Sequence, residues 1–262
     1  MKFAFVFPGQ GSQSLGMMAA YGASPVVRAT FEEASAALGR DLWQLAAEGP
    51  VEALAQTVNT QPLMLTAGIA VWRLWLEEGG SQPAMLAGHS LGEYAALVAA
   101  GVLDLQSAVP LVELRAKAMQ DAVPAGEGAM AAILGMADEK VKAICAEQAQ
   151  GQAVQAVNFN SPEQTVIAGQ AAAVQRAADA CKAGGAKRAI MLPVSAPFHS
   201  SLMQPAAERL QAALADMNFM APSIPVVNNV DVAVVADPAA IKAALVRQAA
   251  APVRWVETLR AM

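Results

Sequence analysis

A serine between two glycines, at the junction of a short apolar run and a helical pattern, constrains this chain most. Gly88-His89-Ser90-Leu91-Gly92 fits G-x-S-x-G, with a strand predicted over Ala84–Ala87 and a helix predicted from Leu91. On so tight a turn, neighbours without side chains leave the serine hydroxyl clear of the backbone. The helix directs its N–H groups and dipole to the point where a carbonyl under attack becomes negative. The pattern therefore predicts Ser90 as a nucleophile and the Leu91 N–H as an oxyanion donor.

The same segment also fits a helix cap. Ser90-Leu91-Gly92-Glu93 matches the S-x-x-E capping box. A cap accounts for Ser90 and Glu93 but requires glycine at neither flank. The nucleophile is therefore the favoured interpretation.

Two histidines are available to activate the serine, and a serine hydroxyl needs a neighbouring base to be nucleophilic at neutral pH. His89 adjoins Ser90, but its side chain should leave the turn in another direction. His199 lies in a predicted loop before a helix, where catalytic groups are common, although a histidine near a helix N-cap is the plain structural alternative. Given the turn at Ser90, we expect His199 to be the base. No Asp or Glu stands out as a third triad member, so a backbone carbonyl or an amide side chain would orient the imidazole.

One arginine lies at the edge of an apolar helix face. In the helix predicted from Asp104, apolar residues recur three or four apart, and Arg115 projects between Leu111 and Met119 at the edge of that stripe. A guanidinium that leans into an apolar surface needs an anionic partner, and Glu113 points elsewhere. Two interpretations remain: a salt bridge to another segment, or bidentate binding of a substrate carboxylate.

The first half of the chain indicates an α/β fold. Predicted strands at Phe3–Phe7 and Ala84–Ala87 alternate with predicted helices at Val26–Leu38 and Gln61–Glu78. Such alternation favours a parallel sheet covered on both faces.

The middle of the chain has a different order of elements, βαββαβ, which is that of the split ferredoxin-like unit. Its predicted elements are Met130–Leu134, Asp138–Gln148, Val154–Asn158, Thr165–Ala168, Ala172–Ala183 and Arg188–Val194. We therefore expect a large α/β catalytic subdomain over residues 1–124 and 193–262, and a ferredoxin-like small subdomain over residues 125–192. Within the returning segment we expect a helix from Ser200, a strand near Pro225–Val227, and helices from Pro238 and Pro252.

Composition restricts the function classes. Apolar runs such as Tyr94–Leu103 reach only about ten residues, half of a membrane span. The first apolar run meets Pro8-Gly9 too early for a signal peptide, and Cys145 and Cys181 have no C-x-x-C partner. We expect a cytoplasmic protein with no metal, no cofactor and no membrane association. A net charge of -5 provides no general attraction to nucleic acid.

Together these residues resemble the malonyl-CoA:acyl carrier protein transacylase family, and the resemblance runs from Lys2 to the end of the chain. The matching segments are Phe5-Val6-Phe7-Pro8-Gly9-Gln10-Gly11-Ser12-Gln13, Gly88-His89-Ser90-Leu91-Gly92-Glu93, Asn158-Phe159-Asn160-Ser161-Pro162, Phe198-His199, Pro225-Val226-Val227-Asn228-Asn229 and Leu245-Val246-Arg247-Gln248. The family usually continues some tens of residues past the position of Met262, so the expectation is either a short form or a truncated chain.

The resemblance implies a hydrolase-like core with a ferredoxin-like subdomain, and it implies the chemistry. Ser90 would attack malonyl-CoA and become a malonyl ester, with His199 as base and then acid. Arg115 would hold the malonyl carboxylate. The phosphopantetheine thiol of acyl carrier protein would then take the malonyl group, which supplies fatty acid synthesis.

The resemblance also assigns supporting roles. The backbone N–H groups of Gln10 and Leu91 would form the oxyanion hole. The main-chain carbonyl of Gln248 would orient the base, which accounts for the missing carboxylate. Phe198, beside the base, would crowd an α-methyl group and so favour malonyl over methylmalonyl.

An acidic carrier needs a basic docking surface. Arg176, Lys182, Lys187 and Arg188 lie close together in the sequence of the small subdomain, and we expect them to form it. A solvated charged face is the alternative. We expect the chain to be a monomer.

Other functions share part of the pattern. A malonyltransferase subunit of a malonate decarboxylase and a polyketide-type acyltransferase would share every residue named. A serine thioesterase or hydrolase would share the turn but have no use for a carboxylate-binding arginine. A non-catalytic carrier-binding module would leave Ser90 and His199 unexplained. Gly9-x-Gly11 after a strand hints at a dinucleotide fold, but position 14 is Ser rather than Gly or Ala.

Overall fold

A computed structural model describes residues 2–194 and 196–262 of the chain. The larger part is built on a three-stranded sheet in the order β1-β2-β7, and both strand pairs are parallel. The strands are β1 (Ala4–Phe7), β2 (Met85–Gly88) and β7 (Val226–Val227). The parallel α/β core predicted from the sequence is therefore confirmed.

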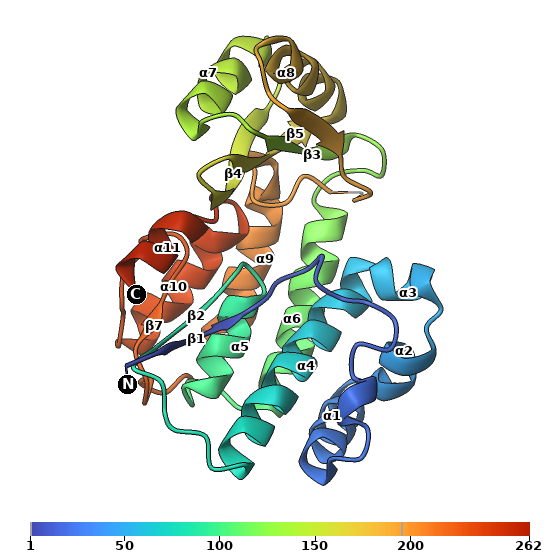
Figure 1. Ribbon diagram of the computed structural model, residues 1–262, viewed down its shortest axis with the longest axis vertical. Helices are drawn as coiled ribbons and strands as arrows, with labels where there is room; N and C mark the ends of the chain where they lie inside the picture. The colour runs from blue at the N-terminus through green and yellow to red at the C-terminus, as the bar shows by residue number, and fades with distance from the viewer. Residues whose placement is uncertain (1, 195) are drawn as a thin grey trace.

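Helices pack around this sheet and supply most of the apolar core (Figure 1). In chain order they are α1 (Pro25–Leu38), α2 (Leu42–Glu48), α3 (Val51–Ala55), α4 (Thr57–Glu77), α5 (Gly92–Ala99), α6 (Leu105–Asp121), α9 (Gln204–Ala215), α10 (Pro238–Ala249) and α11 (Trp255–Ala261), with 3-10 turns at Ala19–Tyr21 and Ser201–Met203. The helices α2 and α3 were not predicted, because segments of seven and five residues are too short for a helical period to emerge.

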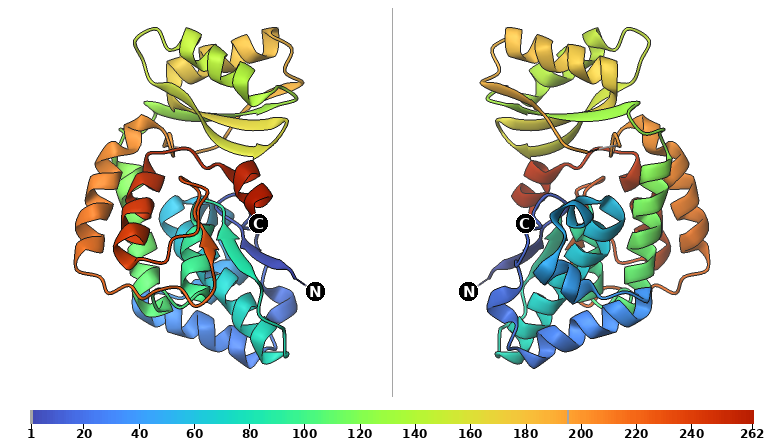
Figure 2. Two further views of the ribbon diagram at one scale, coloured as in Figure 1. Left: turned by 90° about the vertical axis from the view of Figure 1, so that its left-hand side faces the viewer. Right: turned by 90° about the vertical axis from the view of Figure 1, so that its right-hand side faces the viewer.

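The middle of the chain forms a second, four-stranded sheet in the order β4-β5-β3-β6, in which every strand pair is antiparallel. Its elements are β3 (Gly128–Leu134), α7 (Asp138–Gln148), β4 (Val154–Ser161), β5 (Gln164–Gln170), α8 (Ala171–Ala183) and β6 (Arg188–Met191). Figures 1 and 2 show this part standing at one end of the molecule, with α7 and α8 on the face of the sheet turned away from the larger part.

The two faces of the small sheet bury different clusters. On β3, Ala131 and Ile133 pack with residues of α7 and α8, whereas Met130 and Ala132 pack on the opposite face. The second cluster also contacts Phe198, just before the predicted base. This face of the small sheet therefore lies on the side of the predicted active site.

The predicted strand Arg188–Val194 is too long. The strand β6 ends at Met191, because the N–H of Val194 bonds the carbonyl of Leu192 at 2.8 Å and so turns the chain out of the sheet.

The helix predicted from Pro252 begins instead at Trp255. The backbone of Val253 is extended here, because it bonds Val157 at 2.8 Å and Phe159 at 3.0 Å. These two bonds fasten the C-terminal segment of the larger part to β4.

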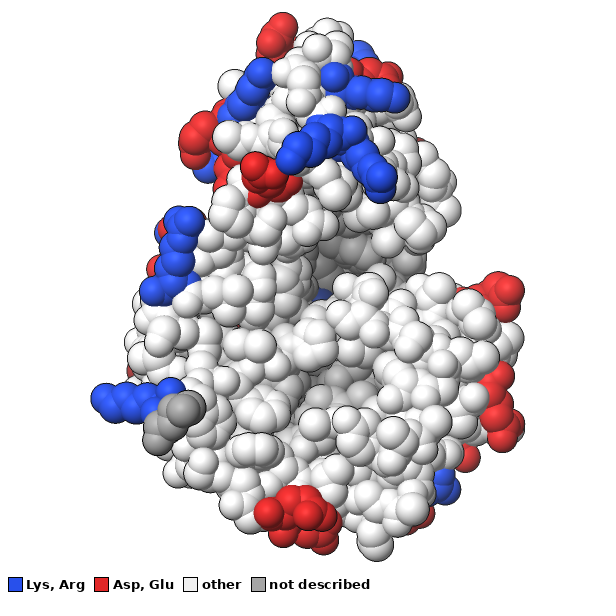
Figure 3. Space-filling view, viewed as in Figure 1, with Lys and Arg blue, Asp and Glu red and all other residues white. Residues whose placement is uncertain are grey.

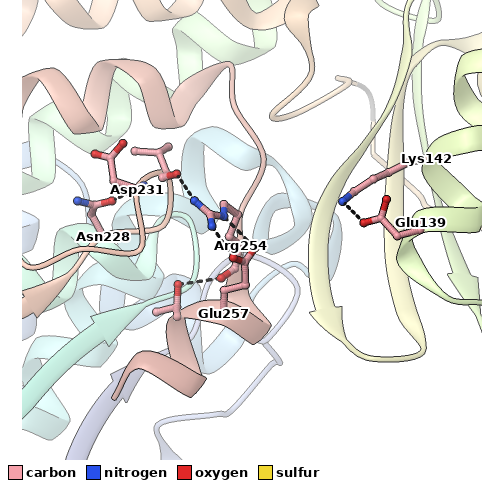
Figure 4. A network of polar contacts seen from close by, with 8 residues as sticks. Glu139, Lys142, Asn228, Asp231, Arg254 and Glu257 are labelled. Atoms are coloured by element: carbon pink, nitrogen blue, oxygen red, sulfur yellow. Dashed lines mark hydrogen bonds and ion pairs between the residues drawn. The ribbon is translucent and has the colours of Figure 1, made fainter.

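Polar contacts lie on both sides of the same junction (Figure 4). Arg254, just before α11, bonds the side chain of Glu257 and, at 3.2 Å, the carbonyl of Val230. On the other side of the junction, Lys142 of α7 forms an ion pair with Glu139 at 2.7 Å. The face in Figure 3 is hollowed between the two parts. Among the described residues, no helix is both long enough and apolar enough to cross a membrane.

Candidate active site

The turn at Ser90 is set by close packing. A Cβ atom on Gly88 would lie 1.8 Å from the carbonyl carbon of Gly92, and one on Gly92 would lie 2.2 Å from the carbonyl oxygen of Phe7. Ser90 itself has a φ of 52°, in the left-handed region that a residue with a side chain adopts only under constraint. Both glycines are thus needed for the turn that presents the hydroxyl, as the sequence argument expects.

The capping-box interpretation is wrong. The helix α5 begins at Gly92, its N-cap is Leu91, and no side chain caps it. Glu93 points away from the helix terminus instead: its Oε2 accepts the N–H of Asn229 at 2.9 Å and the Nε2–H of Gln248 at 2.9 Å.

His199 contacts the nucleophile. Its Nε2 lies 2.7 Å from the Oγ of Ser90, and its Nδ1 lies 2.9 Å from the main-chain oxygen of Gln248. A carbonyl oxygen only accepts hydrogen bonds, so Nδ1 carries the proton and Nε2 is free to accept one from the serine. Burial lowers the pKa of His199 to about 3, and the positive charge of Arg115 lowers it further. The ring is therefore neutral and competent as a base.

Arg115 is buried beside the nucleophile, with 2% of its surface exposed. Its Nη2 donates to the Oγ of Ser90 at 3.1 Å and to the Oε1 of Gln248 at 3.0 Å, and its Nη1 donates to the Oε1 of Gln61 at 2.7 Å. None of the ion pairs in the described part of the chain involves it. The salt-bridge alternative is therefore wrong. A buried cation bonded to neutral groups next to a nucleophile is suited to a substrate anion.

Gln10 and Leu91 lie at the carboxyl edge of the sheet. The strand β1 ends beside β2, with Phe7 opposite Gly88. Gly9 lets the loop after β1 approach the turn, because a Cβ there would lie 2.5 Å from the carbonyl oxygen of His89. The loop after β1 and the start of α5 are thereby brought to one place, as an oxyanion hole would require.

Two polar residues in this network were missed as site residues. Asn229, two residues after the end of β7, accepts the N–H of Ser90 at 2.8 Å and donates to the carbonyl of Gly88 at 2.9 Å. Its place at the carboxyl end of a parallel strand was an available signal, because ligand sites gather there. Gln61 is a buried amide on α4, just before the apolar run that starts at Pro62.

His89 and Phe198 lie at the junction of the two parts. The Nε2 of His89 lies 2.8 Å from the Oδ1 of Asn160 on β4, and its ring contacts Trp255 edge-on. The side chain thus leaves the turn away from the hydroxyl, as expected. Phe198 is partly buried and packs against apolar clusters of both parts.

The four basic residues expected to bind a carrier do not form one free surface. Arg176 donates to the carbonyls of Gln148 and Ala149 at 2.9 and 3.3 Å, and so closes the loop after α7. That part of the expectation is wrong, because the guanidinium is occupied within the subdomain. Lys187 pairs with Glu163 at 3.1 Å, but both side chains are well exposed.

For a ligand, the site thus provides the positive charge of Arg115 and the main-chain N–H groups of Gln10 and Leu91.

The two cysteines lie in the small sheet's helix-covered cluster, where both are buried. Burial raises the pKa of the Cys145 thiol to about 12. In the described part of the chain, no group of three or more His, Cys, Asp or Glu side chains is arranged to hold a metal ion.

Comparisons with known proteins identify the family of this chain. Residues 4–262 match the family model of the acyl transferase domain. The malonyl CoA-acyl carrier protein transacylase of Salmonella typhimurium is 58% identical over 98% of this chain and 84% of its own length. The crystal structure of an acyl-carrier-protein S-malonyltransferase from Burkholderia pseudomallei is 60% identical, with a TM-score of 0.98 over 100% of this chain and 85% of that one.

A third relative was solved together with a partner protein. A malonyl-transacylase solved in complex with its type II PKS acyl-carrier protein is 57% identical, with a TM-score of 0.98 over 99% of this chain and 84% of that one. At this identity and coverage, this chain belongs to the malonyl CoA-acyl carrier protein transacylase family, within the acyl transferases.

Proposed function

We propose that this chain transfers the malonyl group of malonyl-CoA to the phosphopantetheine thiol of acyl carrier protein, through an ester on Ser90, and so supplies fatty acid synthesis. The observation that carries the proposal is the position of one oxygen: the Ser90 Oγ lies 2.7 Å from a neutral imidazole nitrogen and 3.1 Å from a buried guanidinium. The first group activates a nucleophile, and the second binds a carboxylate next to the carbon under attack. The names of the relatives, one of them in complex with a carrier protein, support the same substrates.

In the first half-reaction, the Oγ of Ser90 attacks the thioester carbonyl of malonyl-CoA while its proton moves to the Nε2 of His199. The negative oxygen that forms accepts hydrogen bonds from the N–H groups of Gln10 and Leu91. The carbon–sulfur bond then breaks, and the departing thiolate takes the proton from His199. A malonyl ester on Ser90 and free CoA remain.

The second half-reaction runs the same steps in reverse with another thiol. His199 takes the proton of the carrier's thiol, and the thiolate attacks the ester carbonyl. The ester bond breaks, and Ser90 regains its proton from His199. The main-chain oxygen of Gln248 holds the imidazole tautomer throughout.

The substrate's own charge assists the base. Burial is the main cause of the low pKa of His199, and the cation of Arg115 lowers that pKa further. A malonyl carboxylate on Arg115 offsets that charge and stabilises the imidazolium that forms during attack. An acyl group without a carboxylate leaves the unfavourable charge in place, so Arg115 selects the substrate by affinity and by the basicity of His199.

The observed strand order supports a division of the chain into two subdomains. The strand order β4-β5-β3-β6 with two helices on one face is that of a ferredoxin-like unit. We assign this small subdomain to residues 125–192 and the catalytic subdomain to residues 1–124 and 193–262. Phe198, at their junction, is assigned the exclusion of an α-methyl group, and the chain is assigned to the cytoplasm.

For the carrier we assign a docking surface on the small subdomain formed by Lys187 and Arg188, both exposed, whereas Lys182 lies on α8, which covers the opposite face of the sheet. Residues opposite one another in a sheet share a face, and Arg188 lies opposite Leu134, which packs on the face that carries Phe198. Basic side chains gather over this upper part of the molecule, above the hollow (Figure 3).

Mass spectrometry of the intact protein mixed with malonyl-CoA tests the function. We expect a malonyl adduct that maps to Ser90, that Ser90→Ala abolishes, and that is discharged by the carrier. Labelling of another residue would refute the assignment. Discharge only by the carrier of a malonate decarboxylase or of a polyketide synthase would favour one of those pathways, in which every residue named would serve equally.

A further inference from the structure

Glu93 is a buried carboxyl group to which the transfer chemistry gives no role. Its side chain is 2% exposed, as is that of Arg115, and these are the one carboxyl group and the one guanidinium among the buried side chains that the structure describes. They do not touch. One amide lies between them: the Nε2 of Gln248 donates to Glu93 at 2.9 Å, and the Oε1 of Gln248 accepts from Arg115 at 3.0 Å.

The carboxyl group thereby determines how the amide of Gln248 is turned. An ionised carboxylate only accepts hydrogen bonds, so the NH₂ end of the amide must face Glu93, and its oxygen must face Arg115. The same NH₂ group donates to the carbonyl of Ser90 at 3.0 Å. The orientation of the guanidinium and the backbone of the nucleophile both depend on this contact.

A second path leads from Glu93 to the nucleophile. The N–H of Asn229 donates to the same oxygen of Glu93 at 2.9 Å, and the Oδ1 of Asn229 holds the N–H of Ser90 at 2.8 Å. The left-handed conformation of Ser90 is therefore supported from both sides by groups that meet at Glu93.

We propose that Glu93 is the buried counter-charge of Arg115: it positions the guanidinium through Gln248, and it takes up a proton when the substrate carboxylate binds. This inference rests on the proposed function. In the free protein, above about pH 7, one anion balances one cation. When malonyl-CoA binds, two carboxylates share the single guanidinium, and protonation of Glu93 from solvent relieves the excess negative charge. The proton returns to solvent when the carboxylate leaves.

Among Glu93 and the tyrosine, aspartate and histidine side chains around it, Glu93 is the one whose pKa lies near 7. Burial raises its pKa to about 7, against the hydrogen bonds from Gln248 and Asn229 and the charge of Arg115 on α6. Burial raises the pKa of the adjacent Tyr94 to about 12, so that side chain stays neutral. The side-chain hydrogen bond of Arg247 lowers the pKa of Asp231, in the loop after β7, so that carboxyl stays ionised. Burial keeps His199 neutral, with a pKa of about 3.

The direction in which pH changes the affinity for malonyl-CoA follows from thermodynamic linkage. Below about pH 7 Glu93 is protonated, and Arg115 is free to bind the malonyl carboxylate. Above that pH Glu93 is ionised, and the substrate must compete for the cation. If binding raises the pKa of Glu93 by one unit, affinity for malonyl-CoA falls about tenfold as the pH rises through that range. Acetyl-CoA carries the same phosphates but no carboxylate, so its affinity should not share this fall.

Calorimetric titration of Ser90→Ala, which binds without turnover, tests the proposal. With malonyl-CoA at pH 7, titrations in two buffers of different ionisation enthalpy should give an uptake of up to about 0.5 proton, since a group at its pKa is half protonated. The uptake should be absent with acetyl-CoA, and absent with malonyl-CoA in Ser90→Ala/Glu93→Gln, whose amide still accepts from Gln248.

The possible results distinguish a failure of the role of Glu93 from a failure of the proposed function. If Ser90→Ala prefers malonyl-CoA over acetyl-CoA but both variants take up the same proton, the role of Glu93 is refuted and the function stands. If Ser90→Ala shows no preference for malonyl-CoA, the proposed function fails, and this inference with it. Should Glu93→Gln not fold, Ser90→Ala alone decides: a ratio of malonyl-CoA to acetyl-CoA affinity that stays constant from pH 6 to pH 8.5 overturns the proposal.

Discussion

The Nη2 of Arg115 donates to the Oγ of Ser90 across 3.1 Å, so the cation suited to a substrate carboxylate also touches the nucleophile. The acyl group that reacts best is then one whose carboxylate lies next to the carbonyl under attack, as in a malonyl group. Recognition and chemistry share one hydrogen-bond network, and single substitutions should separate them.

The two histidines should differ sharply in effect. His199→Ala should slow acylation of Ser90 by several orders of magnitude, on the order of 10³ or more, because the hydroxyl loses its base. His89→Ala should cost far less, because its ring bonds Asn160 rather than the hydroxyl. Single-turnover rates with malonyl-CoA measure both, and reversed effects would mean that the base is His89.

The acid limb of acylation should lie well below the ordinary histidine range. In the free protein the pKa of His199 is about 3, mainly because of burial, and a bound carboxylate offsets only the smaller effect of Arg115, so the ring stays neutral as the pH falls. An ordinary histidine with a pKa of about 6.5 would retain about a tenth of its neutral form at pH 5.5. At saturating malonyl-CoA we therefore expect the rate at pH 5.5 to stay above half of that at pH 7.5. A tenfold fall over this range would contradict the burial argument.

Removal of Arg115 should change substrate class rather than chemistry. A charge-assisted hydrogen-bonded pair contributes about 1.5–3 kcal/mol. Arg115→Ala should therefore lower kcat/KM for malonyl-CoA at least about ten- to hundredfold. Acetyl-CoA has no carboxylate to lose, so its slow turnover should hold or improve. Initial rates with both thioesters decide, and an equal loss for both would make the arginine structural.

Phe198 should control the space around the α-carbon of the acyl group. Its ring is wedged between apolar clusters of the two parts. Phe198→Ser should remove the ring that crowds an α-methyl group and raise the methylmalonyl-CoA to malonyl-CoA rate ratio. Phe198→Leu, which stays apolar, is the matched control for lost packing. A ratio unchanged in Phe198→Ser would remove this residue from the account of specificity.

Charge reversal on the small subdomain should weaken binding of acyl carrier protein and leave the reaction with malonyl-CoA unchanged. Lys187→Glu with Arg188→Glu should raise KM for acyl carrier protein, more at low salt because screening is weaker there. The acylation rate with malonyl-CoA should not change. Lys2→Glu is the control, since Lys2 is exposed and lies near the N-terminus, far from the small sheet (Figure 1). An unchanged KM for the carrier at low salt would exclude this surface.

The sequence by itself determined what local sterics and short-range patterns encode. Positions 88 and 92 had to be glycine, because a Cβ at Gly88 would collide with Gly92 and a Cβ at Gly92 would collide with the backbone of Phe7. The apolar periodicity around Arg115 predicted both its helix and a need for an anionic partner. With two histidines in the chain, the base could be named before its distance to the serine was known.

Only the tertiary structure decided which groups meet across long stretches of sequence. Glu93 looked like a helix cap, because the cap pattern is local, whereas its partners lie 136 and 155 residues away. Arg176 was predicted to belong to a docking surface, but its guanidinium donates hydrogen bonds to two carbonyls of a nearby loop. A buried polar group must find a partner, and folding brings that partner from wherever the sheet and helices converge. Sequence spacing does not record that convergence, so the network that joins Glu93 to Arg115 could be read only from the fold.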